Sequence, residues 1–277
     1  MRHYPVFVPH GEDRLASVIT VPDREPNGLV MLLTGGSAAR SHRFKVWART
    51  AERLANEHGL ASVRMDYRGT GDSTGALRQW RMSEMPVGQA VDVLRFAQRA
   101  VGADRVAVVG NCMGARLALE VAAQVPECTA AVCIRTPILG PSAISRVLER
   151  AGRSRLGFPV RRDGFLRRVL IRRLVTRKRK TSAGVRGPVS RALDHGSLLF
   201  LYSEQDFTFN EQVHRELSSM AARLRPRHRD RFELRVLSGG QLKGFESLEI
   251  QTRVIDTVVD WIGVRFGGRR EVASTRG

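Results

Sequence analysis

Residues 110–114 read Gly-Asn-Cys-Met-Gly and place a thiol between two closely spaced glycines. An apolar run at 105–110 precedes Cys112 and an amphipathic pattern at 113–125 follows it, which predicts a sharp turn from a strand into a helix. Such a turn requires small flanking residues and lifts its central side chain above the sheet. The positive end of the following helix favours a thiolate over a thiol. The expected chemistry is nucleophilic attack on an electrophilic carbon.

The elements that must position this turn alternate between short apolar runs and helical patterns along most of the chain. Strands are expected at 15–21, 28–34, 61–66, 105–110, 128–135, 197–203 and 232–238, and helices at 44–59, 86–102, 113–125, around 208–224 and at 247–266. Strands that alternate with helices indicate a mostly parallel sheet that is covered on both faces, so the expected fold class is α/β.

The regular alternation stops in the middle of the chain, which divides it into four parts. Residues 1–137 and 196–266 are expected to form the two halves of one core. Residues 138–195 are an insertion before the last two strands, and residues 267–277 are expected to be a disordered tail.

Composition limits the classes of protein that fit. Hydrophobic residues make up 42% of the 277, which is ordinary for a globular protein, and no run approaches the roughly 18 apolar residues of a membrane span. The N-terminus lacks the pattern of a signal peptide, so a cytoplasmic location is expected. Cys128 and Cys133 lie in an apolar run and are expected in the core. The three cysteines have no spacing typical of disulfides or of a metal site.

The net charge of +19 is concentrated in the insertion. Residues 146–191 contain sixteen basic and two acidic residues, a net charge of +14, and the other 231 residues carry the remaining +5. Within this block, 161–177 has an apolar stripe at helical spacing with arginines around it. This pattern is typical of a helix in a cap over an active site, whose arginine stems cover the core. It also fits docking to an acidic carrier protein, a phosphorylated lipid-linked substrate or an anionic membrane surface. Nucleic acid is not expected, since no binding motif occurs.

With its strand before and helix after, the Cys112 turn resembles the nucleophile elbow of the α/β-hydrolase superfamily, over about residues 1–135 and 196–266. A cysteine at the elbow is similar to dienelactone hydrolases and polyhydroxyalkanoate synthases. The segments 35–43 and 66–73 resemble exosortase-associated hydrolases, which act around extracellular polysaccharide export. Within the second segment, the glycine-rich stretch 69–73 lacks the spacing of a nucleotide-binding loop and is interpreted as a structural turn beside the site.

The resemblance implies roles for individual residues. The N–H of Met113 is the expected first donor of an oxyanion hole, and the second is expected near Gly36 or Ser37 in the loop after the strand 28–34. The acid of the triad is expected after the strand 197–203, where Asp206 stands, with Glu204 as the alternative. No metal or cofactor is expected.

The histidine that the superfamily places after the last strand is missing, and Lys243 occupies its position in the stretch 238–247. His42 belongs to the loop near the expected oxyanion hole and could approach Cys112, although a polar residue opening a helix is the simpler interpretation. The other histidines weighed for this role, His195, His214 and His228, are expected to lie elsewhere.

A lysine ammonium cannot serve as a general base, so hydrolysis of an acylated Cys112 is expected to be the difficult step. Two functions therefore stay open. One is acyl transfer or (thio)ester hydrolysis on a small-molecule ester or thioester, with Cys112, Asp206 and Lys243 at the site and an amine or thiol as the better acceptor. The other is a degenerate homologue that binds or scaffolds without turnover.

Overall fold

The computed structural model describes residues 1–35, 39–77, 84–140, 181–182, 184–206, 209–242 and 244–267. The chain divides into two units, which are Met1–Pro137 with Arg186–Gly277, and Ile138–Val185. The insertion expected at 138–195 is thus longer than the second unit. The last ten residues of that range form a helix of the first unit, because its apolar side packs against the helix that follows Cys112.

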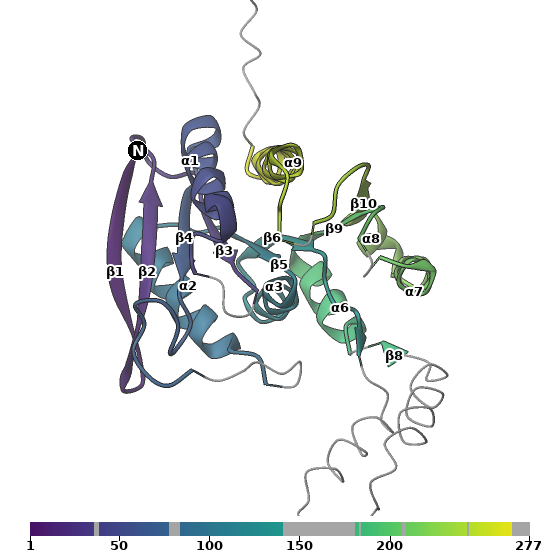
Figure 1. The fold of residues 1–277 in the computed structure, drawn as a ribbon, viewed down its shortest axis with the longest axis horizontal. Coiled ribbons are helices and arrows are strands. Elements are labelled where there is room, and N and C mark those ends of the chain that lie inside the picture. The colour runs from purple at the N-terminus through teal and green to yellow at the C-terminus, as the bar shows by residue number, and fades with distance from the viewer. Residues whose placement is uncertain are drawn as a thin grey trace, which may run out of the picture. The chain divides into compact units, whose positions relative to one another are not determined.

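The first unit contains an eight-stranded sheet in the order β1-β2-β4-β3-β5-β6-β9-β10 (Figure 1). The pairs β1–β2 and β2–β4 are antiparallel, and all other neighbouring strands are parallel. The mostly parallel sheet predicted from the sequence is confirmed. The strands are β1 (Arg2–His10), β2 (Asp13–Val21), β3 (Leu29–Leu33), β4 (Ala61–Met65), β5 (Val106–Asn111), β6 (Cys128–Ile134), β9 (Ser197–Ser203) and β10 (Phe232–Leu237).

Helices cover both faces of this sheet (Figure 1). On one face lie α1 and α9, and on the other lie α2, α3 and α6. The helices are α1 (Val46–His58), α2 (Val87–Val101), α3 (Met113–Gln124), α6 (Arg186–His195), α7 (Glu211–Ala222), α8 (Pro226–Arg229) and α9 (Leu248–Arg265), with a short 3₁₀ turn η1 at Arg43–Lys45.

The central strands are apolar at nearly every position because both of their faces are buried. Alternate residues of these strands join α1 and α9 in one large core cluster. On that face the sheet contributes Val30, Leu32, Ala107, Val109, Ala130, Val132, Ile134, Leu199 and Leu201. The carboxyl ends of β3, β5, β6 and β9 therefore meet at one edge, where loops from distant parts of the chain come together.

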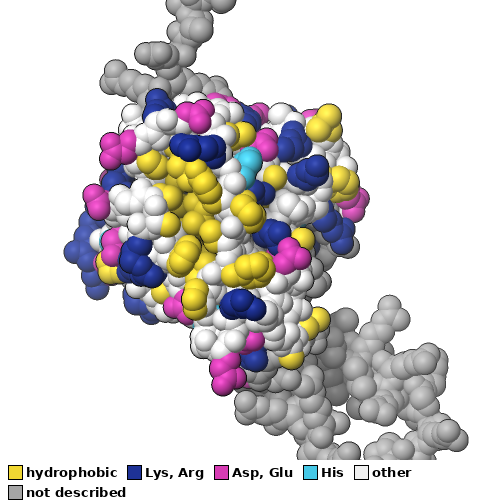
Figure 2. Space-filling model, turned by 90° about the vertical axis from the view of Figure 1, so that its left-hand side faces the viewer, with side chains coloured by type: hydrophobic (Ala, Val, Ile, Leu, Met, Phe, Trp, Pro, Cys, Tyr) yellow, Lys and Arg dark blue, Asp and Glu magenta, His cyan; other side chains and the backbone are white. Residues whose placement is uncertain are grey.

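The first strand, β1, was not predicted from the sequence. It pairs with β2 through a two-residue turn between His10 and Asp13. The backbone N–H and C=O groups of the even-numbered residues of β1 therefore bond to β2, and those of the odd-numbered residues point away from the sheet. Pro5 and Pro9 are odd-numbered, and their missing N–H groups fall on the free edge, where proline is tolerated. A band of apolar side chains with basic residues beside it occupies this side of the molecule (Figure 2).

The first helix begins later than the pattern at 44–59 predicted. Phe44 and Lys45 have φ angles of 54° and 55°, so the regular helix starts at Val46. Its end agrees with the prediction, because Gly59 adopts a left-handed conformation and its N–H bonds back to the carbonyl of Ala55. The loop before α1 is therefore bent at several successive residues.

The second unit contains β7 (Leu139–Gly140), which pairs in antiparallel fashion with β8 (Thr181–Ser182). Residues 141–180 lie outside the described residues, so the amphipathic stretch 161–177 and most of the basic block do too. Of the expected tail, 267–277, the structure describes Gly267 alone.

Candidate functional site

Cys112 stands at the turn between β5 and α3, with φ 56° and ψ −120°. Residues without the freedom of glycine rarely adopt a positive φ, and they keep it only where the surroundings impose it. The surroundings here are backbone. A Cβ on Gly110 would collide with the carbonyl of Gly114, and one on Gly114 would lie 2.5 Å from the Thr34 oxygen and 2.7 Å from the Leu33 oxygen. The two glycines are therefore required by close approach, as the sequence pattern predicted.

Hydrogen bonds on both sides fix this turn. The N–H of Cys112 donates to the carbonyl of Ile134 on β6, at 2.9 Å. The carbonyl of Cys112 accepts from the N–H groups of Ala115 and Arg116, at 3.0 and 3.3 Å. Cys112 is half-exposed, whereas Cys128 and Cys133 are buried in β6 as expected. The thiol of Cys112 thus lies at the surface of a rigid turn.

Cys112 is expected to react with thiol reagents much faster than Cys128 and Cys133 do. Burial raises the pKa of Cys128 and of Cys133 to about 12, so both stay protonated and enclosed at pH 8. An aromatic disulfide reagent should therefore label one thiol of the native protein quickly, and peptide mapping should place the label on Cys112. All three should react after unfolding in denaturant. Fast labelling of Cys128 or Cys133 in the native protein would contradict the burial that the structure shows.

The expected first oxyanion donor, Met113, is the first residue of α3, so its N–H has no partner within the helix. Gly35 packs directly against it. A Cβ on Gly35 would lie 3.3 Å from the Met113 nitrogen, 3.2 Å from the Cβ of Cys112 and 2.8 Å from the Asn111 oxygen. Gly36 and Ser37, predicted to supply the second donor, lie outside the described residues, but the loop that holds them starts beside the first donor.

Asp206, the expected acid, lies after β9 with its side chain fully buried. The guanidinium of Arg135 faces it, with Nε 3.4 Å from Oδ1. Arg135 directly follows Ile134, whose carbonyl binds the Cys112 N–H, so this ion pair lies at the same sheet edge as the elbow. Sequence reasoning did not find Arg135. Its signal was a charged residue placed immediately after an apolar strand, at the edge where the parallel strands end.

The last loop also reaches the acid. The N–H of Leu242 donates to Oδ1 of Asp206 at 3.1 Å, and the hydroxyl of Ser203 donates to the carbonyls of Gly239 and Gly240. Lys243, the next residue, lies outside the described residues. The loop in which the superfamily carries its histidine is therefore anchored at Asp206 through its backbone.

One histidine lies close to the elbow. Nε2 of His42 is 3.2 Å from Nδ2 of Asn111, the residue before Cys112. The other three histidines weighed for the site have partners elsewhere or are exposed. The ring of His195 bonds to the carbonyl of Ala122, His228 is buried against Asp194, and His214 lies exposed on α7.

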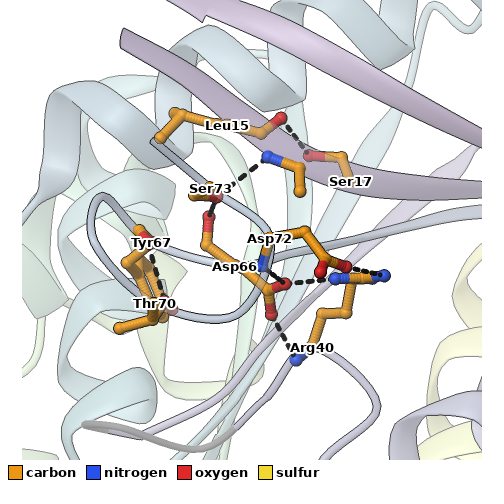
Figure 3. Close-up of polar contacts among 9 residues, drawn as sticks. Leu15, Ser17, Arg40, Asp66, Tyr67, Thr70, Asp72 and Ser73 are labelled. Atoms are coloured by element: carbon orange, nitrogen blue, oxygen red, sulfur yellow. Dashed lines mark hydrogen bonds and ion pairs between the residues drawn. The ribbon is translucent and has the colours of Figure 1, made fainter. Parts of the chain in front are cut away.

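The loop that carries His42 is tied to the turn 69–73 by one buried carboxylate (Figure 3). Asp66 accepts from the backbone N–H of Arg40 at 2.8 Å and from its guanidinium, and the same guanidinium reaches Asp72 at 2.8 Å. A Cβ on Gly71 would collide with the Asp66 carboxylate. The structure thus shows 69–73 as a turn packed on Asp66, and hydrogen bonds of Asp66 join Arg40 in the loop before α1 to this turn.

Replacing Asp66 by alanine is expected to lower the free energy of unfolding by about 2–3 kcal/mol, because it removes a fully buried carboxylate that binds one guanidinium and two backbone N–H groups. This loss of stability is smaller than for an ion pair with both partners buried, because the partly exposed guanidinium of Arg40 can be hydrated once Asp66 is gone. Asp72→Ala is the matched control: its carboxylate is 65% exposed and its loss should cost less than about 1 kcal/mol. Urea denaturation measures both, and equal losses would contradict this account.

Outside the site, the described residues bring ligand atoms of Glu57, His58 and Asp260 within 4.8 Å of one another. This cluster lies at the far end of α1 from His42, and Arg53 already binds both oxygens of Glu57. It is therefore separate from the elbow. Among the described residues, no helix combines the length and the apolar character needed to cross a bilayer.

Comparisons with known proteins agree with the fold described above. A family described as alpha/beta hydrolase fold matches residues 28–191, which is more than half of the chain. No curated protein matches the chain significantly.

Several solved structures of esterases are similar to this chain. A thermostable carboxyl esterase from Bacillus coagulans has a TM-score of 0.66 at 13% identity, over 96% of this chain and 99% of its own. An esterase from Pyrococcus furiosus has a TM-score of 0.60 at 15% identity, over 94% and 93%. The thioesterase domain from the curacin biosynthetic pathway has a TM-score of 0.57 at 13% identity, over 95% and 99%. At these identities the likeness shows the fold alone.

Proposed function

Because this chain belongs to the alpha/beta hydrolase fold family, we propose that it transfers or hydrolyses the acyl group of a small ester or thioester through Cys112. The esterase and thioesterase neighbours support ester chemistry in general. The closer likeness to Cys-elbow dienelactone hydrolases and to exosortase-associated hydrolases stays a prediction.

The conformation of Cys112 carries this proposal. A positive φ at a cysteine, imposed by backbone contacts at Gly110 and Gly114, costs free energy that an ordinary turn with glycine at its centre would not incur. The cost is understandable if the thiol must project from the turn at the N-terminus of α3, beside the Met113 N–H. Together with the Met113 N–H beside it, this geometry supports attack on a carbonyl carbon and stabilisation of the resulting oxyanion.

The proposed partners of Cys112 are Asp206 and Lys243, with Gly36 or Ser37 as the second oxyanion donor. Acylation needs only the nucleophilic sulfur of Cys112. Deacylation by water needs a base that neither an ammonium nor a carboxylate paired with Arg135 readily provides. An amine or a thiol is therefore the proposed acceptor if the last loop alone supplies the chemistry, which would make the protein an acyltransferase.

A second function, binding or scaffolding without turnover, is favoured by one observation. Asp206 already faces Arg135 in a buried ion pair, and such a pair fits a site where the acid is structural. The basic block 146–191 would then provide the docking surface, for an acidic carrier protein or an anionic membrane in the cytoplasm. The two functions differ in whether Cys112 becomes acylated.

Intact-mass measurement separates these functions. The protein is incubated with p-nitrophenyl acetate and with a panel of acetyl, butyryl and octanoyl thioesters of N-acetylcysteamine. The expected result is a mass increase of one acyl group within minutes, and peptide mapping should place it on Cys112. Addition of hydroxylamine should remove the group, as it does from a thioester.

The absence of an adduct with every donor, together with no turnover, would overturn the catalytic proposal and favour binding. An acyl group found on Lys243 instead of Cys112 would also overturn it, since the thiol would then not be the nucleophile.

A further inference from the structure

We propose that His42 is the general base of this site, and that it supplies from the loop before α1 the imidazole that the last loop lacks. The inference rests on the proposed function of Cys112 and deepens it, because it provides the missing group for deacylation.

The position of the ring is the first support. Nε2 of His42 lies 3.2 Å from the side-chain amide of Asn111, which directly precedes Cys112. On its other side the ring centre is 4.9 Å from that of Phe245 and 5.6 Å from that of Trp47. Phe245 belongs to the last loop, two residues after Lys243. The imidazole therefore lies where the elbow meets the loop in which this family usually carries its histidine.

The backbone of His42 is the second support. Its φ of 60° and ψ of 171° fall in a region that is almost restricted to glycine, so a side chain is kept here against conformational strain. Neighbouring contacts hold the loop. The N–H of His42 donates to Ala39 at 2.8 Å, and Arg40 is bound to the buried Asp66. Strained residues that are fixed in this way concentrate at active sites.

The surroundings also keep the ring uncharged. Burial lowers the pKa of His42 to about 4, the charge of Arg43 acts in the same direction, and the backbone carbonyl of Arg43 opposes them. Charged groups near this part of the last loop include Arg43 and Glu246, which both come close to Gly244. Asp206, which is paired with Arg135, binds the N–H of Leu242 in the same loop. The imidazole is thus neutral near pH 7 and has a lone pair that can accept a proton.

Asn111 can fix which nitrogen holds that lone pair. Oδ1 of Asn111 and Nδ1 of His42 are both buried and make no hydrogen bond of normal geometry in the part of the chain that the structure describes, although the backbone of Arg43 lies near the ring. The two ends of an amide have nearly the same shape, so turning it over lets Oδ1 accept the proton of Nε2. Nδ1 then keeps its lone pair. A cysteine, a histidine and an asparagine in these roles form the same set as in papain-like proteases, on an unrelated fold.

His42 carries one proton in each half of the proposed reaction. The Cys112 thiol gives its proton to His42, directly or through one water molecule, and the sulfur forms a bond to the carbonyl carbon. When the C–O or C–S bond to the leaving group breaks, the imidazolium returns the proton to the departing oxygen or sulfur. Water then attacks the thioester carbon while His42 takes one proton from it. The C–S bond to Cys112 breaks, and the thiol regains that proton as the acid is released.

The test uses His42→Gly, which removes the imidazole and suits the observed backbone conformation. With p-nitrophenyl acetate, the initial burst reports acylation and the steady rate reports deacylation. We expect the steady rate to fall about 100-fold and the acyl-enzyme to accumulate in the mass spectrum. Free imidazole should restore part of the rate. In the wild type, the deacylation rate should stay level from pH 8 to pH 5, because a base with a pKa of about 4 is protonated only below that range.

One control variant accompanies this test. His3→Ala removes an exposed histidine of β1 and should leave both the burst and the steady rate unchanged. Lys243→Ala is a comparison variant at a proposed partner of Cys112, and it should slow acylation more than deacylation.

The outcomes separate this inference from the proposed function. A wild-type protein that forms no acyl-enzyme would defeat both. If the wild type turns over while His42→Gly deacylates within about twofold of it and imidazole has no effect, the role of His42 fails and that of Cys112 stands. A larger loss in Lys243→Ala than in His42→Gly would also overturn the role of His42. Alkylation of Cys112 by iodoacetamide, slower in His42→Gly at pH 7, is a readout that needs no substrate.

Discussion

Cys112→Ala is expected to abolish the acyl adduct and to lower turnover of p-nitrophenyl acetate by about 10⁴-fold or more. The variant removes the proposed nucleophilic sulfur, whereas the Met113 N–H stays in place. Alanine is smaller than cysteine and the thiol is half-exposed, so the fold should be retained. Burst kinetics and intact mass measure the effect, and near-UV circular dichroism confirms that the variant is folded.

Cys112→Ser gives a sharper version of the same test. A hydroxyl is far less acidic and a weaker nucleophile than a thiol, so a serine at this position should attack the ester much more slowly. The variant should therefore lose the burst as well, although its shape is almost unchanged. Turnover in Cys112→Ala close to that of the wild type would show that acyl transfer takes place elsewhere on the protein.

Gly114→Ala is expected to lower the free energy of unfolding by about 3 kcal/mol or more, although it adds a single methyl group. The added Cβ would lie 2.5 Å from the Thr34 oxygen and 2.7 Å from the Leu33 oxygen, and both atoms belong to the backbone at the end of β3. No side chain can rotate away to make room. The first turn of α3 must move off the sheet, and Cys112 with it.

Gly88→Ala is the matched control, since this glycine lies in α2 and its Cβ would meet one atom of His10 at an ordinary 3.8 Å. Alanine is the better helix former, so this change should be neutral or stabilise by up to about 1 kcal/mol. Urea denaturation measures both variants, and the dependence of the unfolding free energy on urea concentration should be the same as in the wild type. If Gly114→Ala were as stable as Gly88→Ala, the close packing of the elbow against β3 would be wrong.

The pairing of Asp206 with Arg135 changes how the site should be understood. From sequence, Asp206 and Lys243 formed the natural pair, because they stand where this family carries its acid and its histidine. In the structure Arg135, which follows β6, reaches the acid, and the last loop contributes the backbone N–H of Leu242. Asp206 thus anchors the loop and balances a buried arginine, and the proposed base is His42.

The sequence by itself determined the sheet, most of its helices and the elbow. Each of these depends on residues close together in the chain: buried strands are continuous apolar runs, α1 ends at Gly59, and the elbow needs small residues at 110 and 114. The first strand escaped prediction because Pro5 and Pro9 weaken a strand pattern, and only its place at the sheet edge makes them acceptable. Helix α6 was also missed, because it lies in a charge-rich region and only its packing against α3 shows that it belongs to the core.

Only the tertiary structure decided which side chains meet at the elbow. Arg135 faces Asp206 because β6 lies between β5 and β9 in the sheet. His42 touches Asn111 because the loop before α1 bends through positive φ angles and is held by Asp66, 24 residues further along the chain. Such contacts join loops that follow different strands. They depend on the order of strands in the sheet and on strained backbone angles, and neither leaves a periodic signal in the sequence.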